Sequence, residues 1–243
     1  MCVGYFIDRK FDLTIYEAPK CGGTTLRVWI NFVKNGSLAL ERKVTSEKYL
    51  IGGDGFSSSM RALGYKFNMF KESDTSSNIC IVRDPVERFI SCYNDKIIKE
   101  NRWKAIPNML SPLDIDTFLE NLNNLSKLRK KKNIKSILKK ITNLNSLIIQ
   151  KDDLMKNYLW YHFAPISNQY GTKLDYFERI FTMDEINSEL KVFLENKWKV
   201  VLPFIHTRDA KLSYTLKLPE LSESQLQRIT SFYSADYGNG WSK

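Results

Sequence analysis

The sequence predicts an α/β fold in which a mostly parallel sheet is flanked by helices. Short apolar, β-branched runs alternate along the chain with segments whose apolar residues recur at helical spacing. The run 78–82 (NICIV) is almost continuously apolar, which is typical of strands buried on both faces. The composition, 43% hydrophobic and 26% charged over 243 residues, is that of a globular chain long enough to bury its own core.

The first strand, loop and helix lie near the N-terminus. Residues 13–16 (LTIY) predict a strand, and residues 17–23 (EAPKCGG) predict a tight loop. From Thr24 to Val33, apolar residues recur every three or four positions, which predicts a helix.

A second unit repeats this order. The strand 78–82 is followed by Arg83, Asp84 and Pro85, and a helix is expected from about Val86 to Lys99. Asp84 is a preferred N-cap residue. Pro85 suits the first helical position because it has no N–H group to leave unsatisfied.

The later elements extend the same pattern. Residues 179–182 (RIFT) predict a third strand, residues 184–197 a helix, and residues 222–233 a last helix that begins at a capping serine. From Ile106 to Gln150 the apolar spacing is helical without a strand. We therefore expect one domain over residues 1–243, with a basic helical insert at residues 106–150.

Positive charge is concentrated in that insert. The chain has 37 Lys and Arg against 27 Asp and Glu, a net charge of +10, and residues 127–140 (KLRKKKNIKSILKK) hold eight basic residues and no acidic one. This run either docks a polyanion, with salt-sensitive affinity, or is a solvated helix face that keeps the protein soluble. No aromatic residues alternate with these cations for base stacking, so no nucleic-acid partner is expected.

Several classes of protein are excluded by simple features. The longest apolar run, residues 200–205, is six residues long, whereas a bilayer span needs about 20. The N-terminus lacks the basic segment and unbroken apolar core of a secretion signal, so a cytoplasmic location is expected. The cysteines at positions 2, 21, 80 and 92 form no Cys-x-x-Cys pair. We expect free thiols and, with only two histidines, no metal site.

The loop of the first unit has the composition of a phosphate-binding loop. Gly22 and Gly23 let backbone N–H groups approach an anion closely, and the helix that follows favours negative charge at its N-terminus. Further donors come from Lys20, Thr24 and Thr25. It is not a Walker loop, because Lys20 precedes both glycines. The alternative is a glycine turn that merely joins strand to helix.

A second anion site is predicted after the next buried strand. Arg83 follows that strand directly, and Ser91 lies two helical turns further on. In an open α/β sheet, ligands bind at the carboxyl ends of the strands. An arginine fork and a hydroxyl suit a separate phosphate. In the alternative interpretation Arg83 pairs with Glu87 or caps a carbonyl, and Ser91 is buried.

Together, the two motifs resemble those of the 3′-phosphoadenosine 5′-phosphosulfate (PAPS)-dependent sulfotransferases. Residues 19–26 (PKCGGTTL) are similar to the family's 5′-phosphosulfate loop, and residues 82–93 (VRDPVERFISCY) are similar to its 3′-phosphate motif. The longer form of the second motif is closest to the carbohydrate, or Golgi-type, branch. Weaker similarities follow at residues 160–165 (WYHFAP), 180–185 (IFTMDE) and 233–237 (YSADY).

The resemblance implies a P-loop-like core and transfer of the sulfuryl group of PAPS to a hydroxyl of a carbohydrate or glycan-like acceptor, neutral or acidic. It implies that the 3′-phosphate is held by Arg83 and Ser91. The 5′-phosphosulfate would be held by Lys20, Cys21, Gly22, Gly23, Thr24 and Thr25. Charge builds on the departing phosphate during transfer, so Lys20 is suited to stabilise the leaving group, and no metal is required.

The acceptor hydroxyl needs a general base near neutral pH. His162 is the first candidate, because it lies in a stretch similar to the family and imidazole titrates in the useful range. It can equally be a packed or substrate-contacting residue. The other candidates are Glu17, Asp54, Glu72 and His206, the last of which is close in sequence to Arg208 and Lys211.

Two other functions compete with this prediction. A nucleotide-dependent small-molecule kinase would need Mg²⁺ and a carboxylate to hold it, and the position of Lys20 and the Arg83–Ser91 pair count against it. A non-catalytic polyanion-binding protein would instead use the basic run 127–140.

Overall fold

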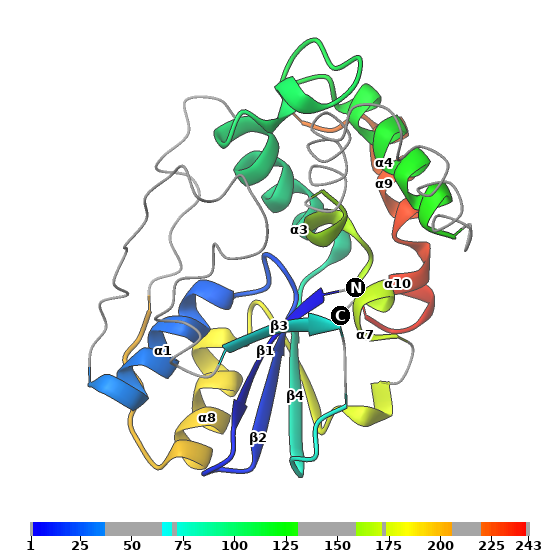
Figure 1. Cartoon of the computed structure of the whole chain (residues 1–243). Coiled ribbons are helices and arrows are strands. Elements are labelled where there is room, and N and C mark those ends of the chain that lie inside the picture. Colours follow the sequence, from blue (N-terminus) through cyan, green and yellow to red (C-terminus); the bar gives the residue numbers. More distant parts are fainter. Residues whose placement is uncertain are drawn as a thin grey trace, which may run out of the picture. The chain divides into compact units, whose positions relative to one another are not determined.

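The structure of the chain is a computed structural model (Figure 1) that describes residues 2–36, 65–69, 72–130, 159–171, 174–205 and 220–241. The chain divides into two compact units. The first comprises Met1–Arg88, Pro165–Ser213 and Ala235–Lys243, and the second comprises Phe89–Ala164 and Tyr214–Ser234. The expected single domain with an insert at residues 106–150 stays a prediction.

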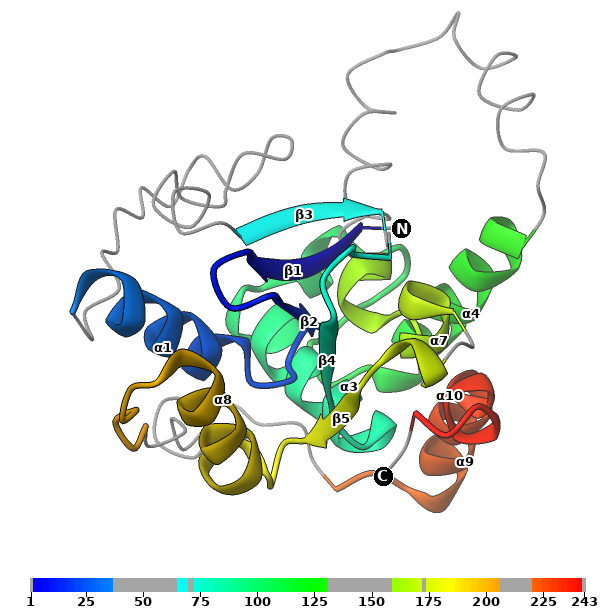
Figure 2. The same cartoon turned by 90° about the horizontal axis from the view of Figure 1, so that it is seen from below.

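The first unit is built on a five-stranded sheet with the strand order β3-β1-β2-β4-β5, which Figure 2 shows from below. The strands are β1 (Cys2–Asp8), β2 (Leu13–Glu17), β3 (Tyr65–Met69), β4 (Ser77–Val82) and β5 (Arg179–Thr182). β1 is antiparallel to both of its neighbours, β2 and β3, whereas β2, β4 and β5 pair in parallel. Four of the five described strands therefore run in one direction, which confirms the predicted mostly parallel sheet.

Helices cover both faces of this sheet. Figures 1 and 2 show α1 (Gly23–Asn35) and α8 (Lys191–Trp198) on one face and α7 (Ile166–Tyr170) on the other. Every residue of β2 and of β4 is buried, as expected for strands covered on both sides. Trp29 of α1 is fully buried, and its indole N–H donates to the carbonyl of Pro203 at 2.9 Å.

Two of the predicted helices are partly π-helical. The segment expected at 86–99 is α3 (Pro85–Cys92) followed by a π-helix, η2 (Tyr93–Lys99). The segment expected at 184–197 is a π-helix, η5 (Ile186–Leu190), followed by α8. Each π turn adds a residue to the helical repeat, so the side chains beyond it face a different direction from those of a continuous α-helix.

The second unit is helical in its described part. It contains η3 (Arg102–Ala105), α4 (Ile115–Lys130), α9 (Glu223–Phe232) and a helical segment at residues 159–163. Four buried aromatic rings form its centre, with neighbouring centroids 4.9–5.9 Å apart: Phe89, Tyr93, Phe118 and Phe163. α4 is helical, as the apolar spacing of that segment predicts, and residues 131–150, with most of the basic run, lie outside the described residues.

The last predicted helix begins as expected. Ser222 caps α9: its hydroxyl accepts from the Gln225 N–H at 3.3 Å, and the Gln225 side chain accepts from the Ser222 N–H at 3.1 Å. This reciprocal capping box satisfies two N–H groups at the helix start. A short helix, α10 (Ser234–Gly238), follows, and its residues from Ala235 onward belong to the first unit.

α10 is tied to α7 by a buried carboxylate. Asp236 is fully buried and accepts hydrogen bonds from the N–H groups of Ile166 and Ser167, both at 2.8 Å. These are the first two residues of α7, so Asp236 supplies the cap that the preceding Pro165 cannot.

Replacing this carboxylate is expected to destabilise the protein. Asp236→Ala leaves two buried N–H groups without an acceptor and should lower the free energy of unfolding by about 2–4 kcal/mol, as judged by urea denaturation. Asp184→Ala, at an exposed carboxylate of the same unit, is the control and should change stability by no more than about 0.5 kcal/mol. Equal midpoints for the two variants would contradict the capping role.

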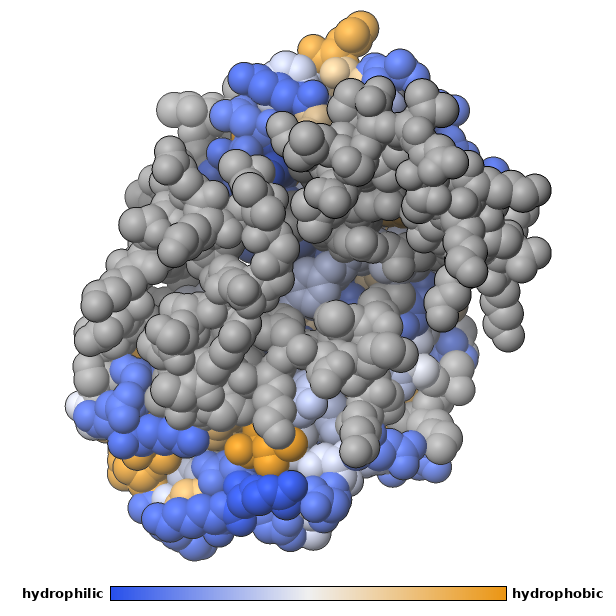
Figure 3. All heavy atoms as spheres, viewed as in Figure 1, coloured by the Kyte–Doolittle hydropathy of each residue, from blue (hydrophilic) through white to orange (hydrophobic). Residues whose placement is uncertain are grey.

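The described surface is mainly polar on the face shown in Figure 3, with small apolar areas between hydrophilic ones. The most exposed large apolar side chains include Leu110, Val201 and Phe204. Single exposed apolar side chains are normal in globular proteins. Within the described ranges, no helix is both long and apolar enough to cross a bilayer.

Candidate functional site

The first motif forms a tight loop between β2 and α1. β2 ends at Glu17 and α1 begins at Gly23, and within the loop Lys20 and Gly22 have positive φ angles of 67° and 78°. Gly22 is the N-cap residue of α1 and has no side chain that could accept from the first-turn N–H groups. A 13-residue helix therefore starts without an N-cap side chain at this point, which suits an external anion.

Both glycines are required by their surroundings. A Cβ at Gly22 would overlap the side chain of Ile186, and the left-handed backbone there is unfavourable for other residues. A Cβ at Gly23 would overlap the carboxylate of Glu17. The loop is thus enclosed by side chains on two sides, and neither glycine is a neutral spacer.

The remaining loop residues differ in exposure. Lys20 is half-buried, Thr24 is exposed and Thr25 is buried. Cys21 is fully buried, its thiol donates to the Pro19 carbonyl at 3.7 Å, and its N–H donates to the Ala18 carbonyl at 3.2 Å. Cys21 therefore shapes the turn.

The structure describes the thiols of three cysteines. Cys21, Cys80 and Cys92 are free and buried. Burial raises the pKa of the Cys80 thiol, and the nearby Cys21 thiol raises it further. Burial therefore favours the neutral form of the Cys80 thiol.

The second motif starts α3 as predicted. Asp84 Oδ1 accepts from the N–H groups of Val86 and Glu87 at 2.9 and 3.0 Å, and Pro85 is the first residue of the helix. The other carboxylate oxygen of Asp84 accepts from the Tyr237 hydroxyl at 3.4 Å. Burial, followed by the adjacent Asp84 carboxylate, raises the pKa of Tyr237 to about 12. Asp84 is therefore fixed by both α3 and α10.

Arg83 pairs with Glu87, one of the alternatives that the sequence left open. The Arg83 Nε lies 3.2 Å from Glu87 Oε2, and the side chains are 26% and 63% exposed, respectively. An exposed ion pair of this kind contributes only about 0–1 kcal/mol, so a phosphate can displace the Glu87 carboxylate at little cost.

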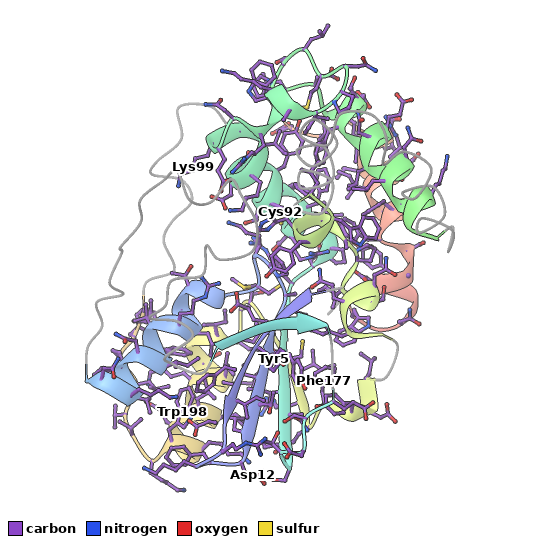
Figure 4. The ribbon with its side chains drawn as sticks, in the orientation of Figure 1. Tyr5, Asp12, Cys92, Lys99, Phe177 and Trp198 are labelled. Carbon is purple, nitrogen blue, oxygen red and sulfur yellow. The ribbon has the colours of Figure 1, made fainter. Side chains whose placement is uncertain are left out.

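The sheet brings the two motifs to the same edge. β2 and β4 are parallel neighbours with Glu17 opposite Ile81, so the loop after Glu17 and Arg83 after Val82 both leave the carboxyl ends of adjacent strands. Figure 4 labels Asp12, which marks the turn between β1 and β2 at the opposite edge. Binding sites of open α/β sheets form at this carboxyl edge.

An ion pair that the sequence did not predict lies beneath the loop. Arg27 Nη2 of α1 is 2.7 Å from Glu17 Oε1, with the Glu17 side chain 7% and the Arg27 side chain 28% exposed. The two residues are ten positions apart and belong to different elements, so no sequence periodicity relates them. Glu17, a candidate general base, is therefore engaged by a cation.

Two of the other predicted residues belong to the second unit. Ser91 is half-buried in α3 and, like His162, belongs to the second unit. The His162 carbonyl accepts from the Cys92 thiol at 3.1 Å, and its ring centroid is 4.9 Å from that of Tyr161.

Of the three further candidates for the general base, the structure describes only Glu72. Glu72 is exposed and precedes Ser73, whose hydroxyl accepts from Thr14 near the amino end of β2. Asp54 and His206, like the neighbouring Arg208 and Lys211, are outside the described residues. Among the residues that the structure describes, no three His, Cys, Asp or Glu side chains come together as metal ligands.

One of three comparisons with known proteins finds a match. No curated protein and no solved structure matches the chain at a significant level. The sequence model of the sulfotransferase family (Sulfotransfer_2), however, matches residues 3–238, which is nearly the whole chain and includes both motifs. The chain therefore belongs to the sulfotransferase family.

Proposed function

We propose that this sulfotransferase uses PAPS as its donor and transfers the sulfuryl group to a hydroxyl of a carbohydrate or glycan-like acceptor. The family membership supports sulfuryl transfer in general. The observation that carries the proposed donor is the position of the phosphate loop and Arg83 at the carboxyl ends of two adjacent parallel strands. PAPS carries one anionic group at its 5′ end and another at its 3′ end. The two motifs at the carboxyl edge of the sheet can therefore each receive one of these groups.

The loop residues fit the 5′ end of such a donor. The uncapped start of α1, the close backbone approach at Gly22 and Gly23, and the half-buried Lys20 are all suited to an anion. PAPS would supply the activated sulfuryl group and the phosphate that departs. Lys20 would hold the departing phosphate, Thr24 and Thr25 would add donors, and Cys21 would shape the turn.

The 3′-phosphate is assigned to Arg83 and Ser91. A guanidinium and a hydroxyl together offer several donors to one phosphate. His162 is the proposed general base, supported by its place in the stretch 160–165 that is similar to the family. Glu17 is a poorer candidate, because its carboxylate is already paired with Arg27.

The donor proposal is tested by calorimetry. Adenosine 3′,5′-bisphosphate should bind about 10- to 100-fold more tightly than 5′-AMP, because one added phosphate gains charge-assisted hydrogen bonds. Equal affinities, or no binding of either nucleotide, would refute it. Magnesium-dependent turnover of ATP would instead favour the kinase.

The acceptor is tested by transfer from labelled PAPS to a panel of neutral glycans, acidic glycans, phenols and tyrosyl peptides. We expect label on a glycan, and a preference for acidic glycans would support a docking role for the basic run 127–140. Label confined to phenols or tyrosyl peptides would refute the carbohydrate proposal. The cytoplasmic location stays a prediction.

A further inference from the structure

An acidic residue lies directly beneath the proposed phosphate loop. Glu17 is 6% exposed, and its carboxylate fills the space where Gly23, the first residue of α1, would carry a Cβ. A negative charge in this position repels any phosphate or sulfonate bound to the same helix start. The loop therefore binds an anion well only if the charge of Glu17 is neutralised.

Arg27 provides that neutralisation. Its Nη2 lies 2.7 Å from Glu17 Oε1. Gly23 and Arg27 are four residues apart in α1 and so share one face of the helix, the face that Glu17 contacts. The ion pair thus connects the end of β2 to the second turn of α1, and the loop 18–22 closes between these two points.

The same contacts restrict the loop conformation. Lys20 has a left-handed backbone, which is disfavoured for a residue with a Cβ and has to be held by the surroundings. Ile186 adjoins Gly22 and the Glu17 carboxylate adjoins Gly23, so the loop is confined from two directions. A loop held in shape before the nucleotide arrives loses less entropy on binding.

We propose that Glu17 and Arg27 form a brace that holds the phosphate loop in its nucleotide-binding conformation, with Arg27 cancelling the charge of the buried acid. Glu17 is then a positioning residue and not the general base. This inference rests on the proposed function, because it assigns the anion in the loop to the nucleotide donor.

The brace predicts a characteristic order of nucleotide affinities. Arg27→Met removes the Arg27 cation from the buried carboxylate, and the Kd for adenosine 3′,5′-bisphosphate should rise about 10- to 100-fold from charge repulsion. The double variant Glu17→Gln/Arg27→Met removes the repelling charge and should regain most of the lost affinity. Glu17→Gln alone weakens the brace but adds no repelling charge, so the Kd should rise less than it does for Arg27→Met.

A second measurement follows the loop itself. In the ligand-free protein, Glu17→Gln should speed amide hydrogen exchange at residues 18–25, because the brace no longer holds the loop. Arg27→Lys retains a cation and should keep the affinity close to that of the wild type, which covers the case that Arg27→Met fails to fold. Arg9→Met is the matched control, because Arg9 forms an exposed ion pair with Asp74 in the same unit and should affect neither measurement.

The possible results distinguish a failure of the brace from a failure of the proposed function. Equal Kd values for Arg27→Met and the double variant, or a wild-type Kd for Arg27→Met, would overturn the neutralising role. If Glu17→Gln left loop exchange unchanged but abolished turnover and the acidic limb of the pH–rate profile, Glu17 would be the base. Failure of the wild-type protein to bind the bisphosphate would refute the proposed function instead.

Discussion

Lys20→Ala is expected to lower kcat about 10²- to 10³-fold, the loss typical when one donor to developing charge is removed. Negative charge accumulates on the bridging oxygen of the departing phosphate only as the sulfuryl group leaves, so the contribution of Lys20 is greatest in the transition state. Nucleotide affinity should fall less than about tenfold, because the loop amides and the start of α1 still bind the 5′ group. Single-turnover transfer from labelled PAPS and calorimetry measure the two effects separately.

The control is another lysine of the same unit. Lys10 is exposed at the turn between β1 and β2, on the sheet edge opposite the loop, so Lys10→Ala should retain full turnover. A Lys20→Ala enzyme with unchanged kcat would remove the leaving-group role. A loss seen only in nucleotide affinity would make Lys20 a binding residue without a specific effect on the transition state.

Arg83→Met is expected to weaken binding of adenosine 3′,5′-bisphosphate about 10- to 100-fold while leaving the affinity for 5′-AMP nearly unchanged. Met keeps much of the apolar stem of arginine but cannot donate to the 3′-phosphate. The ratio of the two affinities isolates this phosphate from the rest of the nucleotide. Calorimetric titrations with both nucleotides provide that ratio.

Glu87→Gln is the natural companion variant. It removes the charge that pairs with Arg83 in the ligand-free structure, so the bisphosphate should bind equally well or slightly more tightly. If Arg83→Met weakened both nucleotides to the same extent, Arg83 would act on the whole nucleotide or on the loop. The assignment to the 3′-phosphate would then be wrong.

The parts of the site that could be predicted from the sequence are those whose chemistry is local. A glycine-rich loop between a strand and a helix, and an Asp-Pro pair at a helix start, each need only a few consecutive residues. Asp84 is indeed the cap of α3, and the loop after Glu17 does enter α1 at Gly23. The apolar runs 13–16 and 78–82 also predicted the two strands that bring the motifs together, since such runs identify doubly covered strands directly.

The parts that could not be predicted depend on contacts between distant residues. β1 and β3 lack the continuous apolar run of β4: β3 (YKFNM) contains Lys66 and Asn68, and β1 leads into the charged turn at residues 8–10. The Glu17–Arg27 pair depends on how α1 folds back along β2. The contact between Ile186 and Gly22 depends on the position of η5 after β5. No periodicity in the sequence encodes these distances.

The contacts around the two motifs have a consequence for how the chain matures during synthesis. The loop at residues 18–22 leaves the ribosome early, but Ile186, which confines Gly22, and Tyr237, which binds Asp84, are made much later. At about 5–20 residues per second, the nascent chain elongates for on the order of ten seconds or more between these events. A newborn chain therefore completes the contacts that confine Gly22 and Asp84 only near the end of its translation.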